Sequence, residues 1–293
     1  MTKRTGLVAM LILFTVFSTV AQLTPMKSQY FQNQYLLNPS MAAKDSATRV
    51  YTNFSSQWTE LTGAPVMMSL SASTPLNSKT ALGFNLISDR AGLLKRTQAM
   101  GSFAYKLILD ETKSIRFGVS LAWTQDRLDN STATANGMND PSLLRYNDLR
   151  EDDWDGNFGI SYITEKFEAQ FSYLNLNQKR SKEFSTVDYS TFYSSLAYKF
   201  ALKDGLTVKP LIAYRGVHNY KNQWDIAAEW GAFSPDFKLY SMYHSNNSVS
   251  GGFGYEYEKK LTLSAIYNSE PAAIRGITGG IFDIVLGYRF GGL

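Results

Sequence analysis

The chain has 293 residues, is rich in aromatic side chains (18 Tyr, 18 Phe and 5 Trp) and contains only 8 Pro. It has no cysteine, which excludes disulfides, a thiol nucleophile, a thiolate metal site and a lipidated N-terminal cysteine. The formal charge is +4 and no basic run supports binding to nucleic acid.

Residues 1–21 have the pattern of a secretory signal peptide. Lys3 and Arg4 form a charged start, an apolar stretch runs from Leu7 to Val20, and Ala21 closes a small-residue cleavage site. A retained anchor helix is the alternative, although the apolar stretch is short and interrupted by polar residues. No later stretch is apolar for long enough to cross a membrane as a helix. An exported chain of this kind is either soluble in the periplasm or closes into a barrel in the outer membrane.

Residues 22–48 are predicted to form an N-terminal arm. The stretch from Gln29 to Leu37 mixes polar and aromatic residues and stops at Asn38-Pro39. The residue before a proline is disfavoured in the helical region, so any helical turn ends there. We predict a short helix or extended arm whose aromatic faces need cover, which places it inside or beneath the following sheet.

Residues 49–293 read as a succession of strands. Each is a run of about six to twelve residues with period-two patterning between turn residues, and the count is an even number, about fourteen, as single-chain bacterial barrels require. The predicted strands are Arg49–Trp58, Val66–Ser73, Thr80–Ser88, Arg96–Lys106, Ile115–Thr124, Trp154–Ile163, Glu168–Leu174, Tyr189–Phe200, Leu206–Tyr214, Gln223–Trp230, Lys238–Tyr243, Val249–Tyr257, Leu261–Asn268 and Ile281–Phe290.

The last strand shows two different faces. One face is wholly apolar from Phe282 to Phe290, whereas Asp283 and Arg289 lie on the other. Ten residues of tilted strand span the hydrocarbon core, and an apolar outer face with a mixed inner face is typical of a transmembrane barrel. Taken alone, this strand is equally consistent with the edge of a soluble β-sandwich. Across the other strands, glycines and small residues gather on the inner face, which suits a filled or narrow lumen.

The lengths of the connections favour the barrel. Alternate connections are short, and the three longest, residues 125–153, 175–188 and 269–280, all fall at the same end. Short periplasmic turns and long outer loops are the rule for outer-membrane barrels, and a sandwich gives no reason for this alternation. The sequence therefore predicts an all-β protein, a transmembrane antiparallel β-barrel of about 14 strands with a short N-terminal periplasmic or plug segment. The predicted lumen charges are Arg116, Lys199, Glu256, Glu258, Asp283 and Arg289.

Two groups of residues could carry chemistry. His244-Ser245-Asn246 has the residue types of a lipase triad, but neighbours on an extended chain point to opposite faces, so a solvated hairpin is favoured. An acidic group surrounds the end of the longest loop, yet its spacing matches no calcium-binding pattern, and a solvated loop is favoured. Its members are Asp148, Glu151, Asp152, Asp153 and Asp155. We predict no catalytic, metal or cofactor site.

The residues from 29 to 106 resemble a known family. The motifs that support the resemblance are Gln29 to Pro39, Gln57-Trp58, Gly63-Ala64-Pro65, Ser69-Leu70-Ser71, Thr74-Pro75-Leu76, Leu82-Gly83-Phe84-Asn85, Ser88-Asp89-Arg90-Ala91-Gly92 and Ala104-Tyr105. This order resembles the N-terminal part of PorP/SprF proteins, which are outer-membrane components of the type IX secretion system of Bacteroidetes-type bacteria. After Asn-Pro, members of the family commonly have an Ala-Tyr-Ala-Gly-like sequence. Here the corresponding residues are Ser40-Met41-Ala42-Ala43, which depart from it.

The resemblance implies an interaction protein and not an enzyme. The implied role is to bind, and to support secretion or surface attachment of, large proteins with a type IX C-terminal domain, such as gliding adhesins. The implied partners are these proteins, other type IX components and outer-membrane lipid. An outer-membrane diffusion channel or hydrophobic-solute transporter is the alternative. The candidate partner-contact residues are the motif positions Asn38, Pro39, Gln57, Trp58, Gly63, Ala64, Pro65, Asp89, Arg90 and Gly92. For Trp58, a membrane-interface anchor is favoured over a partner contact.

Overall fold

A computed structural model describes residues 29–57, 63–128, 150–177, 190–202, 205–217, 221–231, 236–270, 276 and 279–292. Two short 3-10 helices, η1 (Gln34–Leu36) and η2 (Pro39–Met41), precede the strands. The strands are β1 (Ala47–Gln57), β2 (Val66–Pro75), β3 (Thr80–Ala91), β4 (Leu94–Ile108), β5 (Ser114–Leu128), β6 (Arg150–Ile163), β7 (Phe167–Leu174), β8 (Thr191–Tyr198), β9 (Phe200–Ala201), β10 (Thr207–Val217), β11 (Gln223–Gly231), β12 (Phe237–His244), β13 (Ser248–Tyr257), β14 (Leu261–Asn268) and β15 (Ile281–Gly292).

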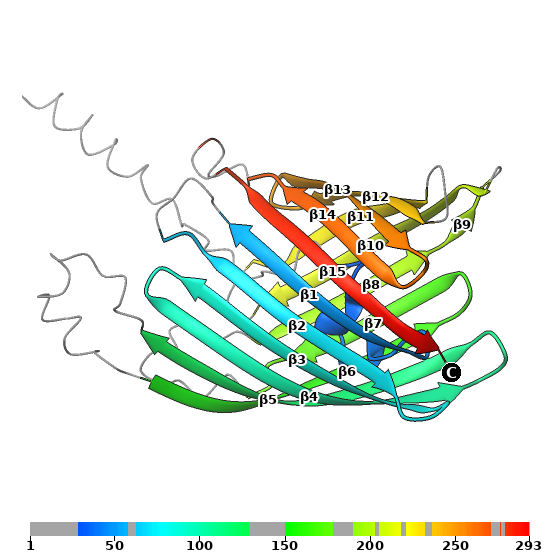
Figure 1. Cartoon of the computed structure of the whole chain (residues 1–293), viewed down its shortest axis with the longest axis horizontal. Helices are drawn as coiled ribbons and strands as arrows, with labels where there is room; N and C mark the ends of the chain where they lie inside the picture. Colours follow the sequence, from blue (N-terminus) through cyan, green and yellow to red (C-terminus); the bar gives the residue numbers. More distant parts are fainter. Residues whose placement is uncertain are drawn as a thin grey trace, which may run out of the picture.

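The strands form one closed antiparallel sheet. Strands that follow one another in the chain are neighbours, and β1 pairs along its length with β15, so the first and last strands close the barrel (Figure 1). Closure gives every strand two partners and leaves no backbone edge in the lipid. Among the described residues, no helix is long and apolar enough to span a membrane.

The barrel has fourteen strands, as predicted, because β8 and β9 are one strand with a break at Lys199. Both pair with β10 in a single register, since Ala197 faces Leu211 and Phe200 faces Val208. Pro210 lies in the gap between these pairs and has no backbone N–H to donate to the ladder.

The predicted faces are confirmed. The large apolar side chains of β5, β13 and β15 point outward, where Leu121 is 61% and Ile284 is 49% exposed to the surroundings. The alternate residues point inward and are buried, including Val285 and Ala122. The outer band is therefore the lipid-facing surface and the inner face is the core.

The predicted asymmetry of the two ends is also confirmed. One end of the barrel carries short turns, such as residues 76–79, 164–166 and 258–260, together with the C-terminus (Figure 1). The strand ends that flank the three long connections, residues 129–149, 175–190 and 269–280, all lie at the opposite end. We refer to these as the turn end and the outer end; by the rule for outer-membrane barrels the turn end faces the periplasm.

Four neighbouring strands extend further at the outer end than their pattern predicts. β3 continues to Ala91, β4 begins at Leu94, β5 continues to Leu128 and β6 begins at Arg150. These additional residues are polar on both faces, so hydrophobic alternation does not reveal them. β3 to β6 therefore form a wall that rises above the lipid-facing band.

The poor alternation of β1 has a structural reason. Its inward residues Asn53, Ser55 and Gln57 are buried although they are polar. They face the N-terminal segment and the polar lumen rather than an apolar core, and Gln29 of that segment donates a 3.2 Å hydrogen bond to Asn53.

Candidate functional site

The N-terminal segment, residues 29–46, lies inside the barrel (Figure 1) and is called the plug below. The predicted end of the helical turn at Asn38-Pro39 is confirmed, because η1 ends at Leu36 and η2 begins at Pro39. Asn38 caps the new turn, with its Oδ1 accepting from the backbone N–H of Ser40 at 3.0 Å. The Asn-Pro motif thus reverses the chain within the lumen.

The Asn38-Pro39-Ser40 turn sits in a notch that two glycines leave in the wall. Gly118 on β5 and Gly159 on β6 are directly paired across the strands. A Cβ on Gly118 would lie 2.2 Å from the Ser40 nitrogen, and one on Gly159 would lie 2.0 Å from the Asn38 Oδ1. Only glycine permits this approach of the plug backbone to the wall.

Polar side chains of the same wall bind the plug backbone. The Arg116 guanidinium on β5 donates from Nε to the Ser40 carbonyl at 2.8 Å and from Nη2 to the Ala42 carbonyl at 2.5 Å. Ser172 on β7 donates to the Leu37 carbonyl at 2.5 Å. These bonds satisfy carbonyls that the short 3-10 turns leave open.

Tyr35 of η1 contacts two further strands, β4 and β3. Its hydroxyl donates to Ser102 Oγ on β4 at 2.7 Å and lies over Gly83 on β3, where a Cβ would come within 2.3 Å of it. Burial raises the pKa of Tyr35 to about 12, so the hydroxyl stays protonated as a donor.

Aromatic residues of the plug contact the wall on the opposite side of the lumen. Tyr30 stacks on Tyr193 of β8 with ring centroids 5.9 Å apart, and Phe31 stacks on Tyr240 of β12 at the same distance. Tyr30 also donates a hydrogen bond to Asp225 of β11. Since the plug contacts both walls, it crosses the lumen rather than lining one side.

Asp225 starts a buried hydrogen-bonded chain across five neighbouring strands, β11 to β15. His244 Nδ1 lies 2.7 Å from Asp225 Oδ1, and His244 Nε2 lies 2.7 Å from Ser250 Oγ. Ser250 donates to Asn268 Oδ1 at 2.6 Å, and Asn268 Nδ2 donates to Asp283 Oδ2 at 2.7 Å. On the other side of Asp225, Arg215 Nε forms a 3.0 Å ion pair. We call this set the buried network.

The buried network contains the residue types of a serine hydrolase triad but is arranged as a structural clamp. Its histidine is fully buried, so the prediction of a solvated hairpin position is wrong for His244. The predicted neighbours play no part: Ser245 Oγ accepts from the Trp224 N–H, and Asn246 Oδ1 accepts from Ser248. The Ser250 proton is directed to Asn268 and away from His244, whereas a nucleophilic serine gives its proton to the histidine.

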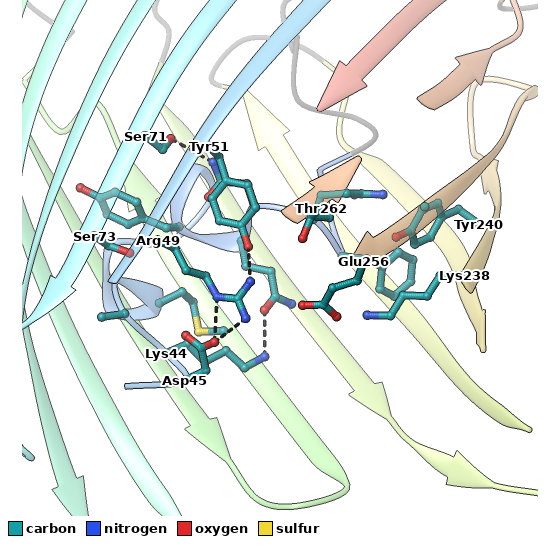
Figure 2. A pocket seen from close by; sticks show the side chains of 18 of the residues that line it. Lys44, Asp45, Arg49, Tyr51, Ser71, Ser73, Lys238, Tyr240, Glu256 and Thr262 are labelled. Carbon is teal, nitrogen blue, oxygen red and sulfur yellow. Dashed lines mark hydrogen bonds and ion pairs between the residues drawn. The ribbon is translucent and has the colours of Figure 1, made fainter. Parts of the chain in front are cut away.

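A cavity of about 240 Å³ lies between the plug and the wall near the turn end (Figure 2). Charges of both signs line it, and several are engaged with one another. Arg49 donates to Asp45 at 2.7 Å and to the Tyr51 hydroxyl at 3.0 Å, and Lys44 donates to Gln34 at 2.9 Å (Figure 2). Lys44 also pairs with Glu168 of β7. The cavity is a polar recess bounded by ion pairs.

The predicted motif residues separate into two places. Asn38 and Pro39 lie in the notch, whereas the other described motif residues lie at the outer end, where the backbone N–H of Gly92 donates to the Gly63 carbonyl at 3.0 Å. Both glycines have positive φ values, +60° and +76°, that favour glycine. The outer members are Gln57, Gly63, Ala64, Pro65, Asp89, Arg90 and Gly92. Trp58 lies outside the described residues.

The predicted lumen charges are partly confirmed. Arg116 and Asp283 are buried inside, Glu256 lines the cavity, and Arg289 lies 3.8 Å from Asp45. Lys199 and Glu258 instead lie exposed at the turn end, because the strand breaks at the first and ends before the second.

The acidic group does not form a cation site among the residues that the structure describes. In this part of the chain, no three acidic, histidine or cysteine side chains are grouped so that they could hold a metal ion. Residues 151–155 belong to β6, so alternate members point to opposite faces. Asp148 lies outside the described residues.

Comparison with known proteins identifies the family and the fold. The family model described as "Type IX secretion system membrane protein PorP/SprF" matches residues 19–288. Comparison with curated proteins found no match.

Solved outer-membrane barrels share the architecture. The Ralstonia pickettii toluene transporter TbuX is 13% identical with a TM-score of 0.54 over 89% of this chain and 93% of that one. The Pseudomonas putida toluene transporter TodX is 12% identical with a TM-score of 0.53 over 88% and 93%. Acinetobacter baumannii Omp33 is 7% identical with a TM-score of 0.51 over 84% and 98%. At these identities the likeness shows the fold alone. The family match covers nearly the whole chain, and the closed barrel agrees with it: the chain belongs to the PorP/SprF family of type IX secretion system outer-membrane proteins.

Proposed function

We propose that this barrel binds large secreted proteins that carry a type IX C-terminal domain, such as gliding adhesins, and supports their secretion or attachment to the cell surface. In this role it acts with other type IX components as an anchor and docking protein. The cargo itself does not pass through its lumen.

The observation that carries this proposal is the occupied lumen. The plug is held to one wall by Arg116 and the glycine notch and to the other by Tyr30, so a polypeptide has no free path between the two ends. A barrel of the secretion system that does not conduct its cargo must act through its surfaces. The outer motif residues from Gly63 to Pro65 and from Asp89 to Gly92 lie at the outer end, where exported cargo arrives.

A disulfide trap distinguishes an anchor from a conduit. The natural chain has no cysteine. Ser40 Oγ of the plug lies 3.0 Å from Ser161 Oγ of β6, so Ser40→Cys with Ser161→Cys would lock the plug to the wall. The matched control is Thr48→Cys with Thr74→Cys, whose oxygens are 2.7 Å apart on the neighbouring strands β1 and β2. These residues alternate with the lumen-facing Arg49 and Ser73, so the control crosslinks the wall on the face away from the plug.

The expected result is that the oxidised plug-locked variant displays cargo as well as the control and the wild type. A deletion strain should lose display of at least one large protein with a type IX C-terminal domain, measured by surface proteomics, and that protein should co-purify with the barrel. Undiminished display in the deletion strain contradicts the proposal. Loss of display only in the oxidised plug-locked variant would make the barrel a conduit.

The alternative function is a diffusion channel or hydrophobic-solute transporter. The observation in its favour is the shared fold with the toluene transporters TbuX and TodX. It requires that the plug move or leave a path, so the locked variant should lose solute uptake in reconstituted vesicles.

A further inference from the structure

His244 in the buried network has a hydrogen-bond partner at each ring nitrogen and is fully buried. Its Nδ1 lies 2.7 Å from a carboxylate oxygen of Asp225, and its Nε2 lies 2.7 Å from the hydroxyl oxygen of Ser250. Which of the two nitrogens carries a proton follows from what each partner can donate or accept. An ionised carboxylate only accepts, so Nδ1 carries a proton and donates it to Asp225.

The far end of the network sets the direction of the Ser250 hydroxyl. Asn268 Nδ2 donates to Asp283 at 2.7 Å, since an ionised carboxylate has no proton to give. The amide oxygen of Asn268 therefore faces Ser250, at 2.6 Å, and an amide oxygen can only accept. Ser250 has a single hydroxyl proton, and this bond uses it. The hydroxyl must then accept from His244, so Nε2 carries a proton as well as Nδ1.

We propose that His244 is a buried imidazolium ion that holds the seat of the plug, and that loss of its second proton loosens the plug. Asp225 lies between this cation and Arg215, whose Nε is 3.0 Å away. With Asp283 as the other carboxylate, the network holds as many positive as negative charges, which is the condition for keeping charges out of water. Asp225 also accepts the hydrogen bond from Tyr30, so the imidazolium and the plug share one carboxylate. This inference does not depend on the proposed binding of cargo.

A second arrangement of protons fits the same heavy atoms. If Asp283 held a proton, the Asn268 amide could turn over, Ser250 could donate to Nε2, and His244 would be neutral. This arrangement leaves a proton on a carboxylic acid while an imidazole lacks one, although the carboxylic acid is the stronger acid of the two. The arrangement with a charged His244 is therefore favoured, and the state of the ring distinguishes the two.

The charged and titratable groups around the ring come from several elements. The plug supplies Tyr30, β10 supplies Arg215, β11 supplies Asp225 and β15 supplies Asp283. Glu270, which follows β14, accepts from a backbone N–H outside the network. Because the imidazolium is the form that the network binds, its contribution to stability is present while the ring is charged. That contribution is lost as the pH rises and the second proton leaves.

The test is nitrogen-15 NMR of the full barrel in detergent micelles, labelled at histidine, which reports whether each ring nitrogen carries a proton. The chain has one other histidine, His218, so the spectrum of His218→Gln assigns the signals of His244 in the wild type. Asn268→Ala removes the acceptor of the Ser250 proton, which is then free to turn to Nε2. Ser264→Ala is the matched control, because Ser264 is buried on the same strand and the same face. Faster gel migration of unboiled than of boiled samples shows that each variant is folded.

At neutral pH we expect both ring nitrogens of His244 to be protonated in the wild type and in Ser264→Ala. In Asn268→Ala we expect a neutral ring with its proton on Nδ1 alone. A neutral ring in the wild type overturns the proposal, and this measurement needs no variant that affects the network. A ring that stays charged in Asn268→Ala overturns the assignment of the Ser250 proton.

The link to the plug is measured by limited proteolysis of residues 29–46 across the pH range in which the imidazolium signal disappears. Cleavage of the wild type should rise by up to about tenfold per pH unit as the signal fades, and level off once it is gone, because one linked proton changes the opening equilibrium by this factor. His244→Gln has no second proton to lose, so its cleavage should respond much less to pH. An equal pH response of the two proteins, or a plug that stays protected while the signal disappears, overturns the role of His244 in holding the plug.

Discussion

Gly118 and Gly159 face each other across β5 and β6, and together they leave the space that the Asn38-Pro39-Ser40 turn occupies. The contact is made by Gly118 against the Ser40 backbone and by Gly159 against the Asn38 side chain and the Pro39 ring. It joins a motif near the beginning of the chain to two strands that lie some eighty and one hundred and twenty residues later.

Replacing Gly118 with alanine should loosen the plug. The new Cβ would lie 2.2 Å from the Ser40 backbone nitrogen, so the turn must move away from Arg116. We expect a loss of about 1–3 kcal/mol in the free energy of unfolding by urea, together with proteolysis within residues 29–46. Gly101→Ala is the control, since its Cβ would meet nothing within 4 Å. Equal stability and equal proteolysis of the two variants would show that the glycine notch does not hold the plug in place.

Asp225→Asn should destabilise the barrel more than any other single change in the buried network. It leaves the buried guanidinium of Arg215 without its counter-charge and weakens the bonds to Tyr30 and His244. Removing one member of a buried ion pair costs about 3–5 kcal/mol. Ser250→Ala removes the hydrogen bonds of an uncharged side chain and should cost about 1 kcal/mol. The urea midpoints of the two variants are compared with that of the wild type. A larger loss of stability in Ser250→Ala than in Asp225→Asn would contradict the claim that Asp225 contributes most to the stability of the buried network.

Deletion of residues 29–46 should convert a closed barrel into a conducting one. The plug fills the lumen of a fourteen-stranded barrel, a size that otherwise encloses a wide interior. In planar bilayers the wild type should show no steady conductance and the deletion variant should show discrete current steps. Heat-modifiable migration on a gel verifies that the variant still forms a barrel. A steady current through the wild type would instead favour the diffusion-channel alternative.

Leu286→Arg should weaken the barrel through the lipid alone. Leu286 lies near the middle of β15 and is 43% exposed on the outer face, so the arginine would meet hydrocarbon. A charge at the membrane midplane costs about 2–4 kcal/mol. Leu76→Arg is a matched change at the turn end, where Leu76 is 54% exposed, and should cost less than about 0.5 kcal/mol. Both are measured by urea unfolding in lipid vesicles, and similar values would argue that the outer face does not contact lipid.

The fold is predictable from the sequence because lipid and lumen impose opposite demands on alternate residues. The alternating apolar and polar residues of β5 and β15 show this directly. The alternation of short and long connections adds the argument for a membrane barrel over a sandwich. The pattern fails where these demands end. Residues 89–91 and 125–128 stand above the lipid with polar groups on both faces, so no alternation marks them as strand.

The candidate site is less predictable because it depends on register. The concentration of small residues on the inner face indicates a filled lumen, but not that Gly118 and Gly159 are paired beside Asn38. Likewise, His244 and Ser250 are six residues apart on two strands, and only the register brings both to Asp225 of a third.

The plug is continuous with β1, since Ser46 is followed at once by Ala47, and β1 is the strand that meets β15. With no slack between them, residues 29–46 enter the lumen at the turn end, beside the seam where the first and last strands meet. The seam therefore fixes one end of the plug, and opening of the β1–β15 pairing would disturb the barrel wall and the seat of the plug together.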